Sequence, residues 1–176
     1  EIVAKRDLKI VYTAMHGVGY RVMKAVFDST GFVFSSVAQQ QEPDGQFPTV
    51  AFPNPEEPGA MDLSFAHALT QHSDLIIAND PDADRLAVGV RSGNGYQMLT
   101  GDQVGLLLAE MIASAKQSGT LANSIVSASL AKVAAFHNLK YQQTLTGFKW
   151  ISKVPDLSFG YEEALGYCID PTFTPD

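Results

Sequence analysis

The hydrophobic positions in the first part of the chain form short apolar runs that alternate with amphipathic stretches. Runs rich in β-branched and aromatic side chains predict strands, and apolar residues recurring every three or four positions predict helices. We therefore predict strands at residues 8–12, 32–37, 74–78 and 86–90, a helix that Gly31 ends, a helix at residues 61–70, and a hairpin turn at residues 92–95. Segment 39–59 carries prolines at 43, 48, 53, 55 and 58, so we expect a long loop there.

A second unit is expected from residue 100 onward. The same patterns predict a helix at 102–115, a strand at 124–129, a helix at 131–138, a strand at 141–145 and a last strand entered at 159–161. Strands that alternate with helices are typical of the α/β class. We expect two consecutive three-layer α/β units, residues 1–99 and 100–176, with mixed, mostly parallel sheets. Because the last strand has no covering helix after it, we expect the second unit to be truncated.

Composition narrows the partners and the compartment. Hydrophobic residues make up 45% and charged residues 18% of the 176, which is ordinary for a globular protein and excludes a disordered chain. Twelve basic against 19 acidic residues give a net charge of −7, so we expect no nucleic-acid partner. No apolar run is long enough to predict a membrane span. The single cysteine, Cys168, excludes an internal disulfide and a cysteine-cluster metal site, and we expect a cytoplasmic protein.

The most specific feature is a row of alternating carboxylates after the predicted strand at 74–78. Asp80, Asp82 and Asp84 lie in one short loop, with Arg85 directly after them. Three carboxylates so close repel one another unless a cation lies between them, and oxygen ligands suit a hard cation such as Mg²⁺. We predict a Mg²⁺ site formed by the three aspartates, with Arg85 binding a phosphate beside it.

Two other interpretations of this loop were weighed. An EF-hand requires glycine at position six and glutamate at position twelve, and here Arg85 and Arg91 occupy them. A solvated acidic turn does not require three alternating aspartates after a buried strand.

The glycine turn at residues 16–19 matches neither a P-loop nor a dinucleotide-binding motif, and we interpret it as a strand-to-helix turn that needs glycine.

Two clusters in the second unit could bind a polyhydroxylated or phosphorylated ligand. The first is Thr146, Gly147, Phe148 and Lys149, followed by Trp150; its alternative is a plain turn with both aromatic rings in the core and the lysine solvated. The second is segment 162–166, where the paired glutamates could accept hydrogen bonds from sugar hydroxyls or could simply lie on the surface. The residues alone leave both alternatives open.

Taken in order, these motifs resemble the α-D-phosphohexomutase family, which contains the phosphoglucomutases and phosphomannomutases. Residues 80–85 resemble the family's metal-binding loop, 146–149 its specificity loop and 162–166 its sugar-binding loop. Segments 10–19, 53–56 and 100–102 also resemble family signatures. The resemblance spans nearly the whole chain and implies domain II followed by the first part of domain III.

The resemblance implies a function and a set of roles. Members move a phosphoryl group between the 1- and 6-positions of a hexose phosphate, through an enzyme phosphoserine and a bisphosphate intermediate. It implies that Asp80, Asp82 and Asp84 hold Mg²⁺, that Arg85 steadies the phosphate and that Glu162 binds sugar hydroxyls. It also implies that Gly147 and Phe148 shape the pocket wall. The remaining substrate-binding residues that it implies are Thr146, Lys149 and Ala164. The implied partners are a phosphosugar substrate, a hexose 1,6-bisphosphate activator and the remaining domains of the parent chain.

Departures from the family pattern limit what is expected of this chain. We expect this chain to lack both the family's Ser-His-Asn phosphoserine motif and its Ser-Gly-Thr phosphate motif. We therefore predict that the isolated chain is inactive. Ala164 stands where many members have serine, which removes a sugar hydrogen bond worth about 0.5–1.5 kcal/mol. Glucose, mannose and pentose phosphates all stay open as substrates. The alternatives are a phosphopentomutase-type enzyme, a non-catalytic phosphosugar-binding module, and a Mg²⁺ phosphatase with Asp80 or Asp82 as nucleophile.

Overall fold

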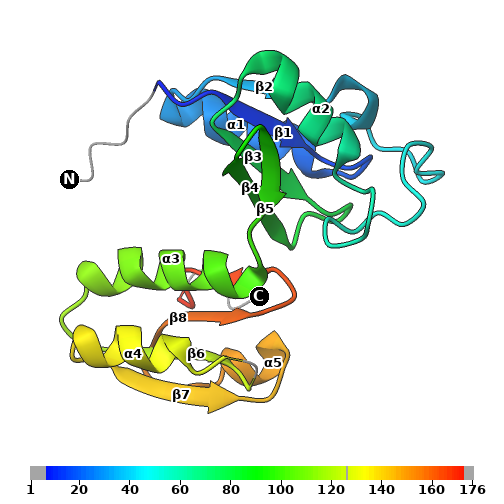
Figure 1. The fold of residues 1–176 in the computed structure, drawn as a ribbon. Helices are drawn as coiled ribbons and strands as arrows, with labels where there is room; N and C mark the ends of the chain where they lie inside the picture. Colours follow the sequence, from blue (N-terminus) through cyan, green and yellow to red (C-terminus); the bar gives the residue numbers. More distant parts are fainter. Residues whose placement is uncertain (1–6, 126, 173–176) are drawn as a thin grey trace. The chain divides into compact units, whose positions relative to one another are not determined.

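The computed structural model describes residues 7–125 and 127–172. The chain divides into two compact units, Glu1–Met98 and Leu99–Asp176, each built from one mixed sheet and its helices (Figure 1). The predicted α/β class is thereby confirmed. Within the described ranges, no helix has the length and apolar character that crossing a membrane requires.

Unit 1 is a five-stranded sheet in the order β2-β1-β3-β4-β5. Strand β1 runs parallel to β2 and β3, whereas β4 and β5 are added as antiparallel hairpins. Parallel pairing brings the carboxyl ends of β1 and β3 to the same edge of the sheet. The elements of the unit are β1 (Ile10–Thr13), α1 (Gly19–Thr30), β2 (Phe34–Ser36), the 3₁₀ helix η1 (Ala38–Gln40), α2 (Asp62–Gln71), β3 (Leu75–Asn79), β4 (Leu86–Ser92) and β5 (Gly95–Met98).

Aromatic rings form the core on the α1 side of this sheet. Tyr12 is fully buried there with Phe27 of α1, and the Phe27 and Phe34 rings stack with their centroids 4.5 Å apart. Helix α2 contacts β1 and β3 from the other face (Figure 1). Helix α1 ends at Gly31, as predicted, because the φ of 75° at this position is one that glycine adopts without strain.

The proline-rich segment 39–59 forms turns beyond η1, as predicted, and it is tied to the end of β1 by buried polar groups. The Thr13 hydroxyl donates to Oε1 of Gln40 at 2.6 Å, and Nε2 of Gln40 donates to the Thr49 hydroxyl at 3.0 Å. The His16 ring lies 2.7 Å from the same Thr49 oxygen. These contacts hold the long loop against the turn that follows β1.

Unit 2 is a four-stranded sheet in the order β7-β6-β8-β9, with β6 parallel to β7 and β8 and with β9 antiparallel to β8. On β6, Leu121 joins the core under α3 and α4, whereas the next residue, Ala122, joins the cluster under α5. The sheet is therefore covered on both faces. The elements are α3 (Gly101–Ser114), β6 (Thr120–Ser124), α4 (Ser129–Phe136), β7 (Lys140–Thr144), α5 (Phe148–Ile151), β8 (Leu157–Glu162) and β9 (Gly166–Cys168).

The sequence prediction for this unit was wrong at the first strand. The predicted strand at 124–129 is instead β6 at Thr120–Ser124, whose residues are all buried. The strand was missed because several of its side chains are polar and give no apolar pattern. They can be buried because their hydrogen bonds are satisfied: the Thr120 hydroxyl, for example, donates to the Pro155 carbonyl at 2.8 Å. Helix α5 and strand β9 were missed because elements of four and three residues give no periodic signal.

Candidate functional site

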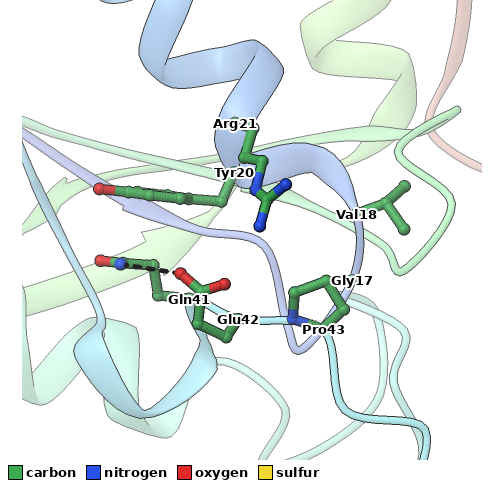
Figure 2. A pocket seen from close by; sticks show the side chains of 7 residues that line it. All are labelled: Gly17, Val18, Tyr20, Arg21, Gln41, Glu42 and Pro43. Carbon is green, nitrogen blue, oxygen red and sulfur yellow. Dashed lines mark hydrogen bonds between the residues drawn. The ribbon is translucent and has the colours of Figure 1, made fainter.

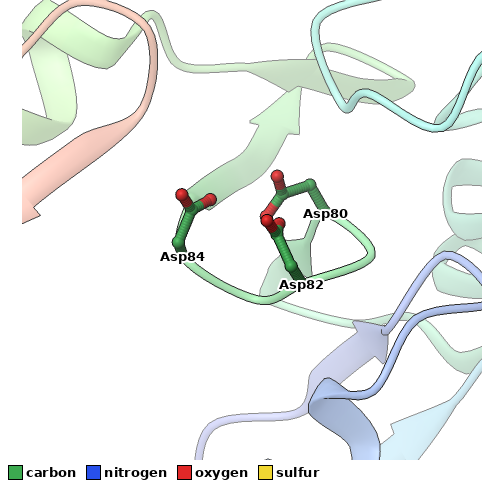
Figure 3. A group of neighbouring side chains, drawn as sticks. All are labelled: Asp80, Asp82 and Asp84. Carbon is green, nitrogen blue, oxygen red and sulfur yellow. The ribbon is translucent and has the colours of Figure 1, made fainter.

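The acidic loop 80–85 joins β3 to β4 at the carboxyl edge of the first sheet. The two strands pair antiparallel up to Asn79 and Leu86, so the loop is the closed end of a hairpin. One carboxylate oxygen from each of Asp80, Asp82 and Asp84 lies within 4.8 Å of the others. All three side chains project toward the inside of the loop's curve (Figure 3). The structure thus brings the three predicted ligands together, with Asp80 buried and the other two exposed.

Arg85 holds the buried carboxylate in place. Its backbone N–H donates to Oδ1 of Asp80 at 3.1 Å, and its Nε donates to Oδ2 at 2.7 Å. Its Nη2 also lies 2.7 Å from Oδ2 of Asp80. Charge-assisted pairs of this kind are short and orient both partners. The guanidinium predicted to bind phosphate therefore also fixes one of the predicted metal ligands, while 30% of its side chain stays exposed.

The charges in this loop are crowded. Burial raises the pKa of Asp84 above its ordinary value, and the negative charges of Asp80 and Asp82 raise it further, against the opposite effect of Arg85. A cation between the carboxylates would relieve this repulsion. Among the described residues the cluster consists of carboxylates alone, and oxygen ligands suit hard cations such as Mg²⁺, so the residues fit the predicted ion.

The glycine turn after β1 lies directly against the acidic loop. The Val18 N–H donates to the Pro81 carbonyl at 2.8 Å, and a Cβ atom on Gly17 would lie only 2.2 Å from the Pro81 Cα. Met15 and His16, which directly precede Gly17, have φ values of 49° and 61°, in the left-handed region. The turn needs glycine, as predicted. The reason, the close approach of a loop from β3, was not visible in the sequence.

A hollow of about 240 Å³ opens beside this turn, between the start of α1 and the long loop. Figure 2 shows the side chains of Arg21 and Glu42 projecting into it. The Glu42 carboxylate accepts a hydrogen bond of 3.3 Å from the Gln41 amide. The residues that line it are Gly17, Val18, Tyr20, Arg21, Gln41, Glu42 and Pro43, and the predicted site residues are not among them.

In unit 2 the two predicted clusters meet at Gly166. A Cβ atom on Gly166 would lie 2.5 Å from the edge of the Phe148 ring and 3.2 Å from Oε1 of Glu162. The Phe148 ring also packs against the buried cluster of Ala122, Ile151 and Val154. The specificity-loop residue Phe148 and the sugar-loop residue Glu162 are therefore neighbours, held together across the close-approach glycine.

The other predicted residues of this region lie more open to solvent. Thr146 and Lys149 are exposed, whereas Gly147 and Ala164 are half-buried. Trp150 is 42% exposed, with the ammonium groups of Lys149 and Lys153 each 5.6 Å from its ring. The alternative that places both aromatic rings in the core is therefore wrong for Trp150.

Several supporting residues were missed by sequence analysis. The Ser124 hydroxyl donates to the Glu163 carboxylate, and a Cβ atom on Gly101 would lie 2.0 Å from the Glu163 carbonyl oxygen. The Tyr161 hydroxyl donates to the Asp102 carboxylate, which links the last residues of β8 to the first turn of α3. Segment 100–102 was recognised only as a family signature. The structure shows that it packs against residues 161 and 163, at the start of the predicted sugar loop.

The expectation that the chain lacks a Ser-Gly-Thr sequence is wrong, because Ser118, Gly119 and Thr120 carry it. These residues lead into β6 at its amino end, whereas Glu162 and Glu163 follow from the carboxyl end of the neighbouring parallel strand β8. Gly119 has a φ of 135° and a Cβ there would lie 1.9 Å from the Ser158 hydroxyl oxygen. The segment therefore forms a tight turn at the opposite edge of the sheet from the sugar loop.

Replacing Phe148 by alanine is expected to lower the free energy of unfolding of unit 2 by about 2 kcal/mol, because a half-buried ring is lost from a packed cluster. Urea denaturation measures this change. Phe136 of α4 is the matched control, since its side chain is 78% exposed. Phe136→Ala is expected to change the free energy by no more than about 0.5 kcal/mol. Equal losses in the two variants would contradict the packing described for Phe148.

Comparison with known proteins decides the family. The family model for phosphoglucomutase/phosphomannomutase alpha/beta/alpha domain II matches residues 1–93, and the model for domain III matches residues 100–176. The chain belongs to the phosphoglucomutase/phosphomannomutase family. The resemblance inferred from residues 80–85, 146–149 and 162–166 is thereby confirmed.

Individual members of the family agree in sequence and in fold. A probable phosphomannomutase of Haemophilus influenzae is 51% identical over 94% of this chain, and a phosphoribomutase of Saccharomyces cerevisiae is 40% identical over 89%. A phosphoglucomutase/phosphomannomutase family protein from Burkholderia thailandensis matches 93% of this chain in fold, with a TM-score of 0.82 at 21% identity. The matches cover 35%, 29% and 35% of those proteins, so the chain spans about a third of their length.

Proposed function

We propose that this chain is the central part of a Mg²⁺-dependent phosphosugar mutase, with the metal site in unit 1 and the sugar site in unit 2. The observation that carries the proposal is the convergence of three carboxylates to within 4.8 Å at the end of β3. Open α/β sheets place their ligands at the carboxyl ends of strands, where this loop lies. The proposed reaction moves a phosphoryl group between the 1- and 6-positions of a hexose phosphate.

Different residues of unit 1 would bind the ion and the phosphate. Arg85 keeps Asp80 in a fixed position, while the exposed Asp82 and Asp84 complete the donor set from the open side of the loop. Bound Mg²⁺ would offset negative charge on the transferring phosphoryl group. The exposed part of the Arg85 guanidinium would bind a phosphate oxygen beside it. The phosphoserine and the hexose 1,6-bisphosphate of the proposed reaction come from outside these residues.

The residues of unit 2 would select the sugar. Glu162 would accept hydrogen bonds from sugar hydroxyls, and the adjacent Phe148 ring would form the wall beside them. Thr146 and Lys149, both exposed at the start of α5, would contact the substrate from the specificity loop. Ala164 offers no hydroxyl to the sugar. A pentose phosphate is the second candidate substrate, since one relative is a phosphoribomutase that is 40% identical.

A role for Asp80 as ligand accounts for its surroundings better than a role as nucleophile. Both of its oxygens accept hydrogen bonds from Arg85, and its side chain is only 2% exposed. A phosphatase of the aspartyl type needs a carboxylate oxygen free to attack phosphorus. Incubation with BeF₃⁻ tests this difference: an aspartyl adduct on Asp80 or Asp82 would contradict the mutase proposal, and its absence is expected.

The proposal is tested by a coupled mutase assay on the complete parent protein. The assay supplies Mg²⁺, a catalytic amount of sugar bisphosphate, and the 1-phosphates of glucose, mannose and ribose in parallel. Turnover that disappears with a chelator and returns with Mg²⁺ is the expected result, and the preferred sugar ranks the candidates. The isolated 176-residue chain is expected to give no turnover. A well-folded parent protein that converts none of the three sugars would favour a phosphosugar-binding module instead.

A further inference from the structure

We infer that Asn79 is the positioning residue of the acidic loop, and that Tyr12 holds Asn79 in place. The inference rests on the proposed function, because it takes the loop to bind a metal ion. Asn79 is the last residue of β3 and was not among the residues predicted from the sequence to form the site. It is not one of the three predicted ligands, and we infer that it acts through Arg85 and Asp80.

The Asn79 side chain spans the open end of the loop. Its Nδ2 donates to the backbone carbonyl of Arg85 at 2.6 Å, from one end of the loop to the other. Only 8% of Asn79 is exposed, and the hydrogen bond is partly buried. Arg85 in turn donates three hydrogen bonds or ion-pair contacts to Asp80 through its backbone N, Nε and Nη2. The position of the buried ligand Asp80 therefore depends on Arg85, and that of Arg85 depends on Asn79.

The other end of the amide is fixed from the core. The Tyr12 hydroxyl, which is fully buried, donates to Oδ1 of Asn79 at 2.9 Å. A Cβ atom on Gly19 would lie 2.8 Å from the Tyr12 hydroxyl oxygen and 3.6 Å from Oδ1 of Asn79, so the first residue of α1 closes over this pair. Burial raises the pKa of Tyr12 above its ordinary value, which keeps the hydroxyl a donor at neutral pH.

The two contacts also fix which way the amide faces. Oδ1 must accept from Tyr12 and Nδ2 must donate to a carbonyl, so an amide satisfies both partners, whereas a carboxylate would oppose the Arg85 carbonyl. The two ends of the loop are therefore held at a fixed spacing, because the loop cannot widen without breaking a partly buried hydrogen bond. Partners of this kind, one shell outside the ligands, typically change metal affinity about 10–100-fold when they are removed.

The inference is tested by titrating the complete parent protein with Mg²⁺ alone and measuring the heat of binding by calorimetry. Asn79→Ala is expected to raise the dissociation constant of Mg²⁺ about 10–100-fold, and Tyr12→Phe, which keeps the buried ring, about tenfold. Because Tyr12 acts through Asn79, the double variant is expected to bind Mg²⁺ no more weakly than Asn79→Ala does. Tyr12→Phe is the variant that retains the fold if Asn79→Ala does not.

Unit 2 offers a matched control. The Tyr141 hydroxyl donates to Oδ1 of the buried Asn123 at 2.9 Å, the same chemistry at the same distance but in the other unit. Tyr141→Phe is expected to lower the urea midpoint, as Tyr12→Phe does, and to leave the dissociation constant of Mg²⁺ unchanged.

The outcomes separate the inference from the proposed function. If the Tyr12 and Asn79 variants are less stable but bind Mg²⁺ as tightly as the wild type, their role is only structural and the inference is overturned. If the wild type does not bind Mg²⁺, or if Asp80→Asn binds it as tightly as the wild type does, the proposed metal site is wrong and the inference is overturned with it. Weaker Mg²⁺ binding in both variants, with the Tyr141→Phe value unchanged, supports the inference.

Discussion

Replacing Asp80 by asparagine is expected to lower the turnover of the complete protein by at least about 100-fold, the loss seen when one preorganised electrostatic contact is removed from an active site. Asparagine keeps the size of the side chain but removes a negative ligand and weakens the hold on Arg85. The measurement is the rate of phosphosugar interconversion at saturating Mg²⁺, together with the dissociation constant of Mg²⁺. A variant with wild-type turnover would contradict the assignment of residues 80–85 as the metal loop.

The same substitution separates Asp80 from its neighbour Asp84 in the metal-free protein. Asp80→Asn is expected to lower the free energy of unfolding by about 2–3 kcal/mol, less than a fully buried ion pair would cost because Arg85 is partly exposed. Asp84→Asn is expected not to lower it, because burial and the neighbouring carboxylates already disfavour the charge on Asp84. Both variants are nevertheless expected to weaken Mg²⁺ binding. Equal stability losses would contradict the different environments described for the two carboxylates.

The substitution Gly17→Ala is expected to have the second largest effect. The new Cβ atom would lie 2.2 Å from the Cα and 2.3 Å from the carbonyl oxygen of Pro81, and backbone atoms cannot move aside as a flexible side chain does. The acidic loop must then shift. We expect a loss of about 1–3 kcal/mol in the free energy of unfolding, and weaker Mg²⁺ binding. Urea denaturation and calorimetry measure the two effects.

Gly45 provides the control for this prediction. It lies in the long loop of the same unit, and a Cβ atom there would meet nothing within 4 Å. Gly45→Ala is expected to leave both the unfolding free energy and the Mg²⁺ affinity near their wild-type values. If Gly17→Ala behaved like Gly45→Ala, the close contact between the glycine turn and the acidic loop would be refuted.

The helices and strands could be predicted where the buried positions are occupied by apolar residues. Strands β1, β3 and β4 are apolar runs, and α3 begins at a capping box that the sequence spells out in Thr100 and Gln103. Prediction failed at β6, where burial is not matched by apolar character. The strand carries Thr120, Asn123 and Ser124 in the interior, and each has a hydrogen-bond partner far along the chain, in Pro155, Tyr141 and Glu163 respectively. A local pattern carries no information about partners at that separation.

The candidate site was predictable to the extent that charge made it unusual. Alternating aspartates are costly without a cation, so the acidic loop is visible in the sequence. The proximity of Phe148 and Glu162 is not visible there, because it depends on how α5 and β8 pack against the same glycine, Gly166. Asn79 was overlooked for a related reason, because it ends an apolar strand. Its bond to Tyr12 becomes visible only when β1 lies beside β3, and its bond to Arg85 only when the β3–β4 hairpin is formed.

Trp150 gives this chain a built-in optical reporter. It is the one tryptophan among 176 residues, and it lies exposed in α5 with two lysine ammonium groups each 5.6 Å from its ring. Intrinsic fluorescence excited at the indole band therefore reports from α5 of unit 2. An anionic sugar phosphate that draws Lys149 or Lys153 away from the ring would change the emission. Binding at this end of unit 2 can thus be followed without an attached dye.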